Sequence, residues 1–81
     1  METRIAVIAI VAESRDHIDE MNRVLSAYGE YIIGRMGVPY PKKKVSIISV
    51  AIDAPGDIIS ALSGKLGKLP GVSTKTVYSR V

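Results

Sequence analysis

The sequence predicts an α+β sandwich, in which a four-stranded antiparallel sheet carries two helices on one face and the element order is βαββαβ. Three observations predict this fold class. Residues 4–13 and 45–53 are apolar at odd and even positions alike, which is typical of central strands covered on both sides. A stretch with helical periodicity follows each of these strands. The two halves also repeat at an offset of 40 residues, so that IAVIAIVAESRDHI (5–18) aligns with VSIISVAIDAPGDI (45–58).

The first half contributes a strand, a helix and a second strand. Ser14 is a suitable N-cap for the helix, and acidic residues at 16, 19 and 20 suit its positive N-terminal end. The helix is expected to end at Gly29, and its apolar stripe consists of Ile18, Met21, Leu25 and Tyr28, with Val24 beside it. The strand at 30–39 contains Gly34, Gly37 and Pro39, which favour an edge position.

The second half starts after the turn PYPKKK and repeats the pattern. Residues 45–53 form the third strand, and Pro55 fits the first turn of the second helix. The apolar stripe of this helix is formed by Ile58, Leu62 and Leu66, and Gly67 with Pro70–Gly71 ends it. The last strand, 72–80, is mostly polar, which favours the other edge of the sheet.

Two halves of this kind form the split βαβ, or ferredoxin-like, fold. Right-handed crossovers place both helices on the same face of the sheet. The strands at 4–13 and 45–53 are then central, as their apolar pattern requires independently. We therefore expect residues 1–81 to form a single domain.

The second face of the central strands has no helix to cover it. We assign the bulkier residues to the helix side, namely Ile8, Ile10, Ile48, Val50 and Ile52. The open side then carries Ile5, Val7, Ala9, Val11, Val45, Ile47, Ser49 and Ala51. Burying four to six of its aliphatic side chains is worth roughly 5–10 kcal/mol per subunit before costs are subtracted, which rivals the total stability of a domain. This predicts a homo-oligomer, a dimer or tetramer, in which sheet faces or edges pair and the apolar members of the open side form the interface.

Composition excludes several classes of protein. The chain has no Cys, so it has no disulfide, no thiol nucleophile and no cysteine-ligated cluster. No apolar run is long enough to span a membrane, the start METRIAVIAIVAES does not have the form of a signal peptide, and a cytoplasmic location fits. Residues 1–30 hold six acids and three bases (net −3), whereas residues 31–81 hold two acids and eight bases (net +6). We expect no cofactor and no metal.

Few residues suggest chemistry. His17 is the only histidine and lacks partners for a metal site, so we interpret it as a surface residue. Glu13 and Asp53 occupy matching positions after the central strands; they could form a carboxylate pair for acid–base catalysis, but helix capping is favoured. Lys42–Lys44 lie in a turn, where lysines oppose edge aggregation; phosphate contact is the alternative.

Two further groups suggest a ligand site. Alternation with Ile33 and Ile47 places Tyr31, Arg35 and Ser49 together on the open face, where the guanidinium needs a carboxylate from another subunit or an anionic ligand. In the second helix, Ser60, Ser63, Gly64 and Lys65 form a small polar strip, and Gly64 predicts a closely packed neighbour. SGKLGK does not have the spacing of a phosphate-binding loop. The candidate ligand-binding residues are Tyr31, Arg35, Ser49, Asp53, Ser63 and Lys65.

The segments YGEYIIGRMGVPY (28–40) and ISVAIDAPGDIISALSGKLGKLPGVSTKTVYS (48–79) are similar to the family of iron-only hydrogenase system regulators. The fold that this resemblance implies is ferredoxin-like, similar to the C-terminal domain of nickel-responsive regulators and to ACT domains. Nickel binding does not carry over, because the His and Cys ligands are missing. Operator binding does not carry over either, because no ribbon-helix-helix segment is present. In ACT-type domains effectors lie at subunit interfaces near the first strand–helix turn, which corresponds to residues 13–16 and 53–57.

The resemblance implies a role in maturation or regulation of the iron-only hydrogenase. The leading hypothesis is a regulatory module that is not an enzyme: an oligomer that senses a small ligand or binds a protein, with a hydrogenase-maturation protein as a candidate partner. The alternative is a nucleic-acid-binding regulator that uses the basic C-terminal half. A small hydrolase of the acylphosphatase type is least favoured, because no arginine-bearing anion loop follows the first strand.

Overall fold

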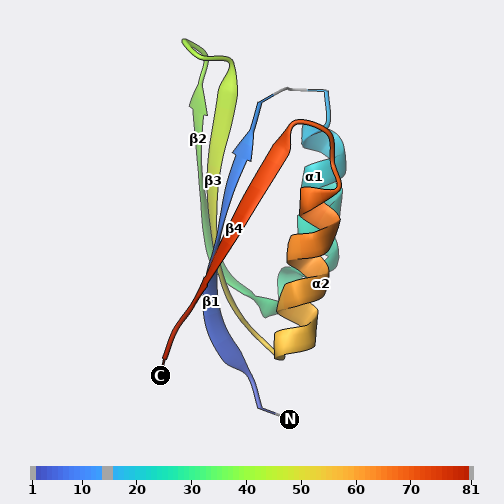
Figure 1. Ribbon diagram of the computed structural model, residues 1–81, viewed down its shortest axis with the longest axis vertical. Coiled ribbons are helices and arrows are strands. Elements are labelled where there is room, and N and C mark those ends of the chain that lie inside the picture. The colour runs from blue at the N-terminus through green and yellow to red at the C-terminus, as the bar shows by residue number, and fades with distance from the viewer. Residues whose placement is uncertain (1, 14–15, 81) are drawn as a thin grey trace.

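The computed structural model describes residues 2–13 and 16–80 of the chain. Its elements are β1 (Arg4–Ala12), α1 (Ile18–Ala27), the 3-10 turn η1 (Gly29–Tyr31), β2 (Ile32–Tyr40), β3 (Val45–Ala54), α2 (Gly56–Gly67) and β4 (Val72–Tyr78). The strands form one antiparallel sheet in the order β2-β3-β1-β4. Both helices lie on the same side of this sheet (Figure 1). The predicted ferredoxin-like fold, with β1 and β3 in the centre, is therefore confirmed.

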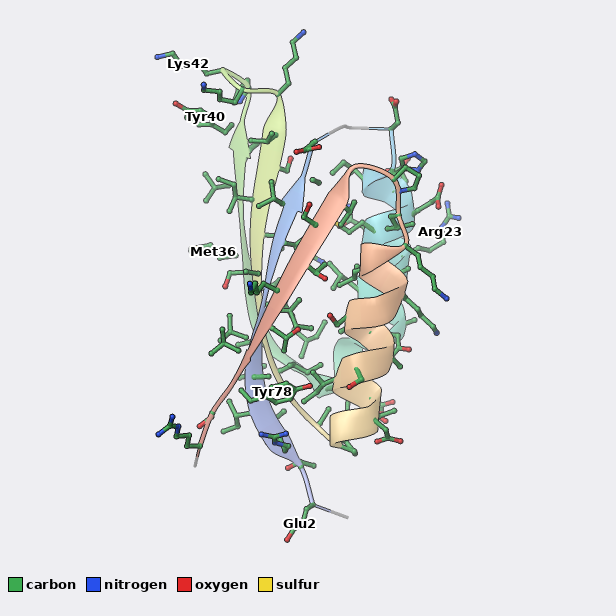
Figure 2. The ribbon with its side chains drawn as sticks, viewed as in Figure 1. Glu2, Arg23, Met36, Tyr40, Lys42 and Tyr78 are labelled. Atoms are coloured by element: carbon green, nitrogen blue, oxygen red, sulfur yellow. The ribbon has the colours of Figure 1, made fainter. Side chains whose placement is uncertain are left out.

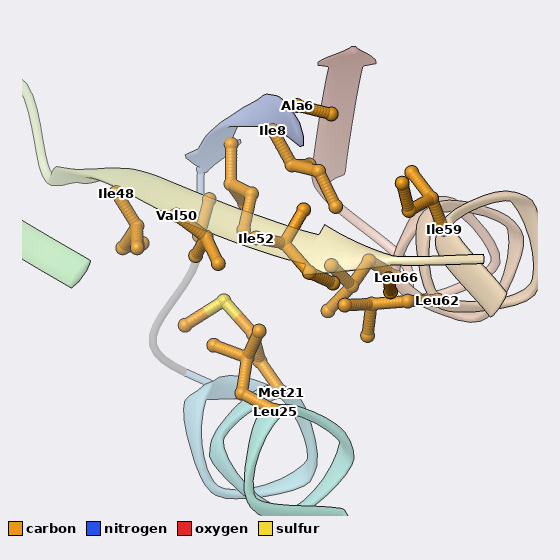
Figure 3. Close-up of a cluster of buried hydrophobic side chains, with 13 residues drawn as sticks. Ala6, Ile8, Met21, Leu25, Ile48, Val50, Ile52, Ile59, Leu62 and Leu66 are labelled. Carbon is orange, nitrogen blue, oxygen red and sulfur yellow. The ribbon is translucent and has the colours of Figure 1, made fainter. Parts of the chain in front are cut away.

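The core lies between the sheet and the helices, and alternation in β1 and β3 builds it. Ile8, Ile10, Val50 and Ile52 are fully buried, as their assignment to the helix side predicted. From the helices, the buried residues are Met21 and Leu25 of α1 and Ile59, Leu62 and Leu66 of α2 (Figure 3). Leu62 and Leu66 of the predicted α2 stripe are thus confirmed, whereas its first buried member is Ile59 and Ile58 only packs against the core.

Helix α1 begins later than the sequence suggested. Its N-cap is His17, which makes no side-chain capping hydrogen bond, and Asp19 and Glu20 occupy the first turn as expected. The predicted N-cap, Ser14, lies outside the described residues. Helix α2 begins at Gly56, and the carbonyl of Pro55 accepts hydrogen bonds from the backbone N–H groups of Ile58 (3.0 Å) and Ile59 (3.1 Å). Neither N-cap residue, His17 or Pro55, makes a side-chain capping hydrogen bond, and the predicted capping residues Glu13 and Asp53 do not occupy the N-cap positions.

Strand β2 contains an irregularity that changes which side chains face the helices. Ile32 pairs with Ile52 and Gly34 pairs with Ala51, so one extra residue, Ile33, is inserted between two consecutive pairs. Such a bulge reverses the alternation that follows it. Arg35 consequently pairs with Val50, a helix-side residue, and the prediction that Arg35 lies on the open face is wrong.

Candidate binding surfaces

The side of the sheet away from the helices is apolar and uncovered. Nine large apolar residues are between 39% and 67% exposed on the described chain: Ile5, Val7 and Val11 of β1, Ile33, Met36, Val38 and Tyr40 of β2, Ile47 of β3 and Val77 of β4. Met36 and Tyr40 project from β2 away from the helical layer (Figure 2). We call these nine residues the apolar face. The face assignment predicted for β1 and β3 is confirmed, with Ala9 exposed and Val45, Ser49 and Ala51 half-buried on the same side.

The apolar face has a centre and, along part of β4, a polar border. Ile47 lies near the centre, since it pairs with Val11 on one side and Val38 on the other. Along β4 the positions on the same side are Ser73 and Lys75, which pair with Val11 and Ala9, followed by Val77, which belongs to the apolar face. An apolar centre with a polar margin is the usual anatomy of a protein–protein interface.

Sequence reasoning missed the contribution of β2 to the apolar face. Met36, Val38 and Tyr40 alternate with period two, which is a signal for one strand face. The prediction extended the alternation from Ile33 across the bulge and so placed these residues on the wrong side. If the alternation is followed backwards from Tyr40, it places Met36, Val38 and Tyr40 together on the apolar side of the strand.

A groove lies on the other side of β2, where α1 leaves the edge of the sheet uncovered. Its volume is about 210 Å³. The apolar lining comes from Ile18 and Met21 of α1, Ile48 of β3, and the Gly37–Pro39 segment of β2. The polar lining consists of Asn22, Arg35 and Ser46. Arg35 is therefore the one ionised side chain that lines the groove within the described chain.

The bulge in β2 delivers Arg35 to this groove. Its Nη2 donates a hydrogen bond of 3.0 Å to Oδ1 of Asn22 in α1. The acceptor is a neutral amide, so this contact orients the guanidinium without neutralising its charge. The predicted carboxylate partner across an oligomer interface does not apply to an arginine on the helix side.

The other predicted ligand residues are distributed over the molecule. Tyr31 packs against the core from η1, Ser49 lies on the open side, and Asp53 is exposed opposite Ile5. The hydroxyl of Ser63 accepts a hydrogen bond from Thr76 Oγ1 at 3.3 Å.

In α2, Nζ of Lys65 lies 5.1 Å from the ring centre of Tyr28, a cation–π contact. Gly64, expected to have a close neighbour, has open space within 4 Å of where its Cβ would be. The six candidates therefore do not form one site, and Arg35 alone lines the groove.

The positions of His17, Glu13 and Asp53 do not indicate a catalytic or metal-binding role. His17 Nδ1 lies 3.3 Å from Glu20 Oε1 on the exposed side of α1. Glu13 and Asp53 are at opposite ends of the sheet, because β1 and β3 are antiparallel and Ile5, not Glu13, pairs with Asp53. Eight residues of strand separate them, about 27 Å, so they cannot form a carboxylate pair.

No group of three or more His, Cys, Asp or Glu side chains in the described part of the chain could hold a metal ion. Within residues 2–13 and 16–80, no helix is long and apolar enough to span a membrane.

Comparison with known proteins gives one family. Residues 4–76 match the family model TM1266-like, described as "Iron-only hydrogenase system regulator, putative". A solved structure, the uncharacterized protein TM1266 from Thermotoga maritima, is 36% identical, with a TM-score of 0.95 over 98% of this chain and 100% of that one. An unknown protein from Galdieria sulphuraria shares the fold, with 18% identity and a TM-score of 0.67 over 99% of this chain and 47% of its own. No curated protein matches.

Proposed function

The chain belongs to the TM1266-like family of iron-only hydrogenase system regulators, and we propose that it works there as an oligomeric module that senses a small molecule and binds a partner without catalysis. The observation that carries the proposal is the apolar face. A surface of this kind is suited to recognition by another protein rather than to chemistry on a substrate.

The first occupant that we propose for the apolar face is a second copy of the chain. A specific protein–protein interface of standard size buries about 800 Å² per partner. Nine large side chains that are roughly half exposed offer an area of this order. Two sheets pack face to face about 10 Å apart, and a two-fold axis through Ile47 would place the apolar centres together and both polar borders outside.

The test is the oligomeric state of a charged variant. Ile47→Lys puts an ammonium into the centre of the proposed interface, where it cannot reach water, and we expect association to weaken at least tenfold. The matched control is Ser60→Lys, which adds the same charge at an exposed position of α2, away from the sheet.

Sedimentation velocity at micromolar concentration is the measurement. We expect a multiple of the 8.7 kDa chain mass for the unmodified protein and for Ser60→Lys, and monomer for Ile47→Lys. An unmodified protein that sediments as a monomer at this concentration would refute assembly through the apolar face.

Direct nucleic-acid binding remains a second candidate from the sequence, but no structural observation favours it. The basic residues are divided among surfaces: Lys42–Lys44 lie in the β2–β3 turn, Lys65 and Lys68 on or next to α2, and Lys75 on the open side of β4. A titration with DNA and RNA at two salt concentrations decides this point. Salt-sensitive binding that is lost when Lys42–Lys44 are changed to Ser would support the alternative.

A further inference from the structure

We propose that the groove between α1 and β2 binds a small organic carboxylate with a short apolar chain, held by Arg35 at its charged end and by the floor of the groove at the other. The inference names a ligand class for the proposed small-molecule sensing and rests on it.

Charge determines which end of a ligand the groove attracts. Among the lining residues only Arg35 is ionised, and its one hydrogen-bond acceptor in the described chain is the amide oxygen of Asn22. A guanidinium has five N–H donors in a fixed fork, which matches the two oxygens of a carboxylate. The hydroxyl of Ser46 lines the same groove and is a further donor.

The apolar floor of the groove indicates that the uncharged part of the ligand is apolar too. Met21 projects from α1 toward the sheet (Figure 3), and Ile48 of β3 lines the groove beside it. Both side chains belong to the core, so the groove opens onto apolar atoms rather than onto polar ones. An aliphatic chain laid on this floor would leave water, which favours binding in proportion to the area covered.

The size of the groove sets the length of that chain. Its volume of about 210 Å³ exceeds the ~150 Å³ of an apolar cavity that admits benzene and is below the ~300 Å³ of the smallest drug-sized pockets. This range corresponds to a ligand of roughly six to ten non-hydrogen atoms.

Gly37 keeps the groove open. It is the helix-side residue of β2 that follows Arg35, and it pairs with Ile48. A Cβ built on Gly37 would lie 3.9 Å from Cγ1 of Ile48, an ordinary contact distance. A side chain at this position therefore fits without a clash, but it would occupy the space that the proposed ligand needs.

The experiment is a titration of the full-length protein, followed by ¹⁵N–¹H NMR, with hexanoate as the probe. Hexanoate has a carboxylate and an aliphatic chain within the size range, hexanamide lacks the charge, and hexylammonium reverses it. We expect hexanoate to shift the amide signals of the groove with a Kd of about 1 mM, and the two controls to bind at least tenfold more weakly.

Three variants locate the site. Arg35→Gln should weaken hexanoate binding at least tenfold, whereas Arg35→Lys, which keeps the charge but not the fork, should weaken it less. Gly37→Val should abolish binding by filling the groove. The matched control is Gly34→Val, on the same strand but on the open side, where a Cβ has no neighbour within 4 Å; it should bind hexanoate unchanged.

The dispersion of the NMR spectrum checks that each variant is folded, and Gly37→Val tests the groove even if Arg35→Gln fails to fold. Equal binding of hexanoate and hexylammonium, shifts confined to other parts of the molecule, or full binding by Gly37→Val would overturn the inference. Its failure is distinguishable from that of the proposed assembly. An oligomer that ignores hexanoate contradicts the ligand class alone, and a monomer that binds it in the groove contradicts the assembly alone.

Discussion

The two faces of the sheet have similar sequences and opposite environments. On the helix side, Ile8 of β1 and Val50 of β3 are completely buried; on the other side, Val7 of β1 and Ile47 of β3 are 41% and 47% exposed. Both pairs come from β1 and β3, and both faces are aliphatic. An apolar strand face therefore predicts that something covers it, but not what the covering element is. Whether the cover is a helix of the same chain or another molecule follows from counting the helices available.

Truncating one residue on each face of the sheet should give the largest difference in stability. Ile8→Ala leaves a cavity in the packed core and should lower the free energy of unfolding by about 2–5 kcal/mol. Ile47→Ala removes a side chain that is already half in solvent, and should cost less than about 1 kcal/mol at concentrations below those of association. Urea denaturation at low protein concentration measures both. Equal losses would mean that the open face is covered within the chain.

The concentration dependence of thermal unfolding also depends on what covers the open face. If copies cover the open face, a tenfold increase in concentration adds about 1.4 kcal/mol per dimer and should raise the Tm by roughly 3–5 °C. The Tm of Ile47→Lys should not depend on concentration, while Ser60→Lys should behave like the unmodified protein. A constant Tm for all three would contradict assembly.

The smallest expected effect lies outside both faces. Gly64 is in the interior of α2, exposed, with open space around it. Gly64→Ala should therefore raise the free energy of unfolding by about 0.5–1 kcal/mol, because alanine restricts the unfolded chain and favours a helix. Association should be unchanged. A loss of association or of stability would show that α2 contacts another chain at this position, as the sequence had suggested.

The sequence predicted the central strands correctly, because the pattern of apolar residues alone determines their position and orientation. In β1 and β3, apolar residues at odd and even positions alike gave the central position, and placing the bulkier set on the helix side gave the correct face of each residue. Residues such as Ile10 and Val11 therefore lie on the sides that the pattern predicted. The order of the strands followed from the handedness of the crossovers.

The prediction failed at β2, because a bulge interrupts the alternation of side chains along this strand and the composition of the strand does not reveal it. A bulge depends on pairing with β3, so the inserted Ile33 cannot be recognised from the residues of β2 alone. This one residue moved Arg35 to the groove and separated it from Ser49. The groove itself was not predictable, since it results from how α1, β2 and β3 pack together rather than from any motif.

The bulge also has an evolutionary consequence. From Gly34 to Tyr40, the side of the sheet on which each residue lies depends on its distance in sequence from the inserted Ile33. The number of residues in this segment therefore matters more than the type of amino acid at position 33. Among homologues we expect position 33 to accept many amino acids, while the segment after it keeps a constant length. A single-residue insertion or deletion there would move Arg35 to the open side of the sheet and its apolar neighbours to the helix side. Both the groove and the apolar face would then be lost.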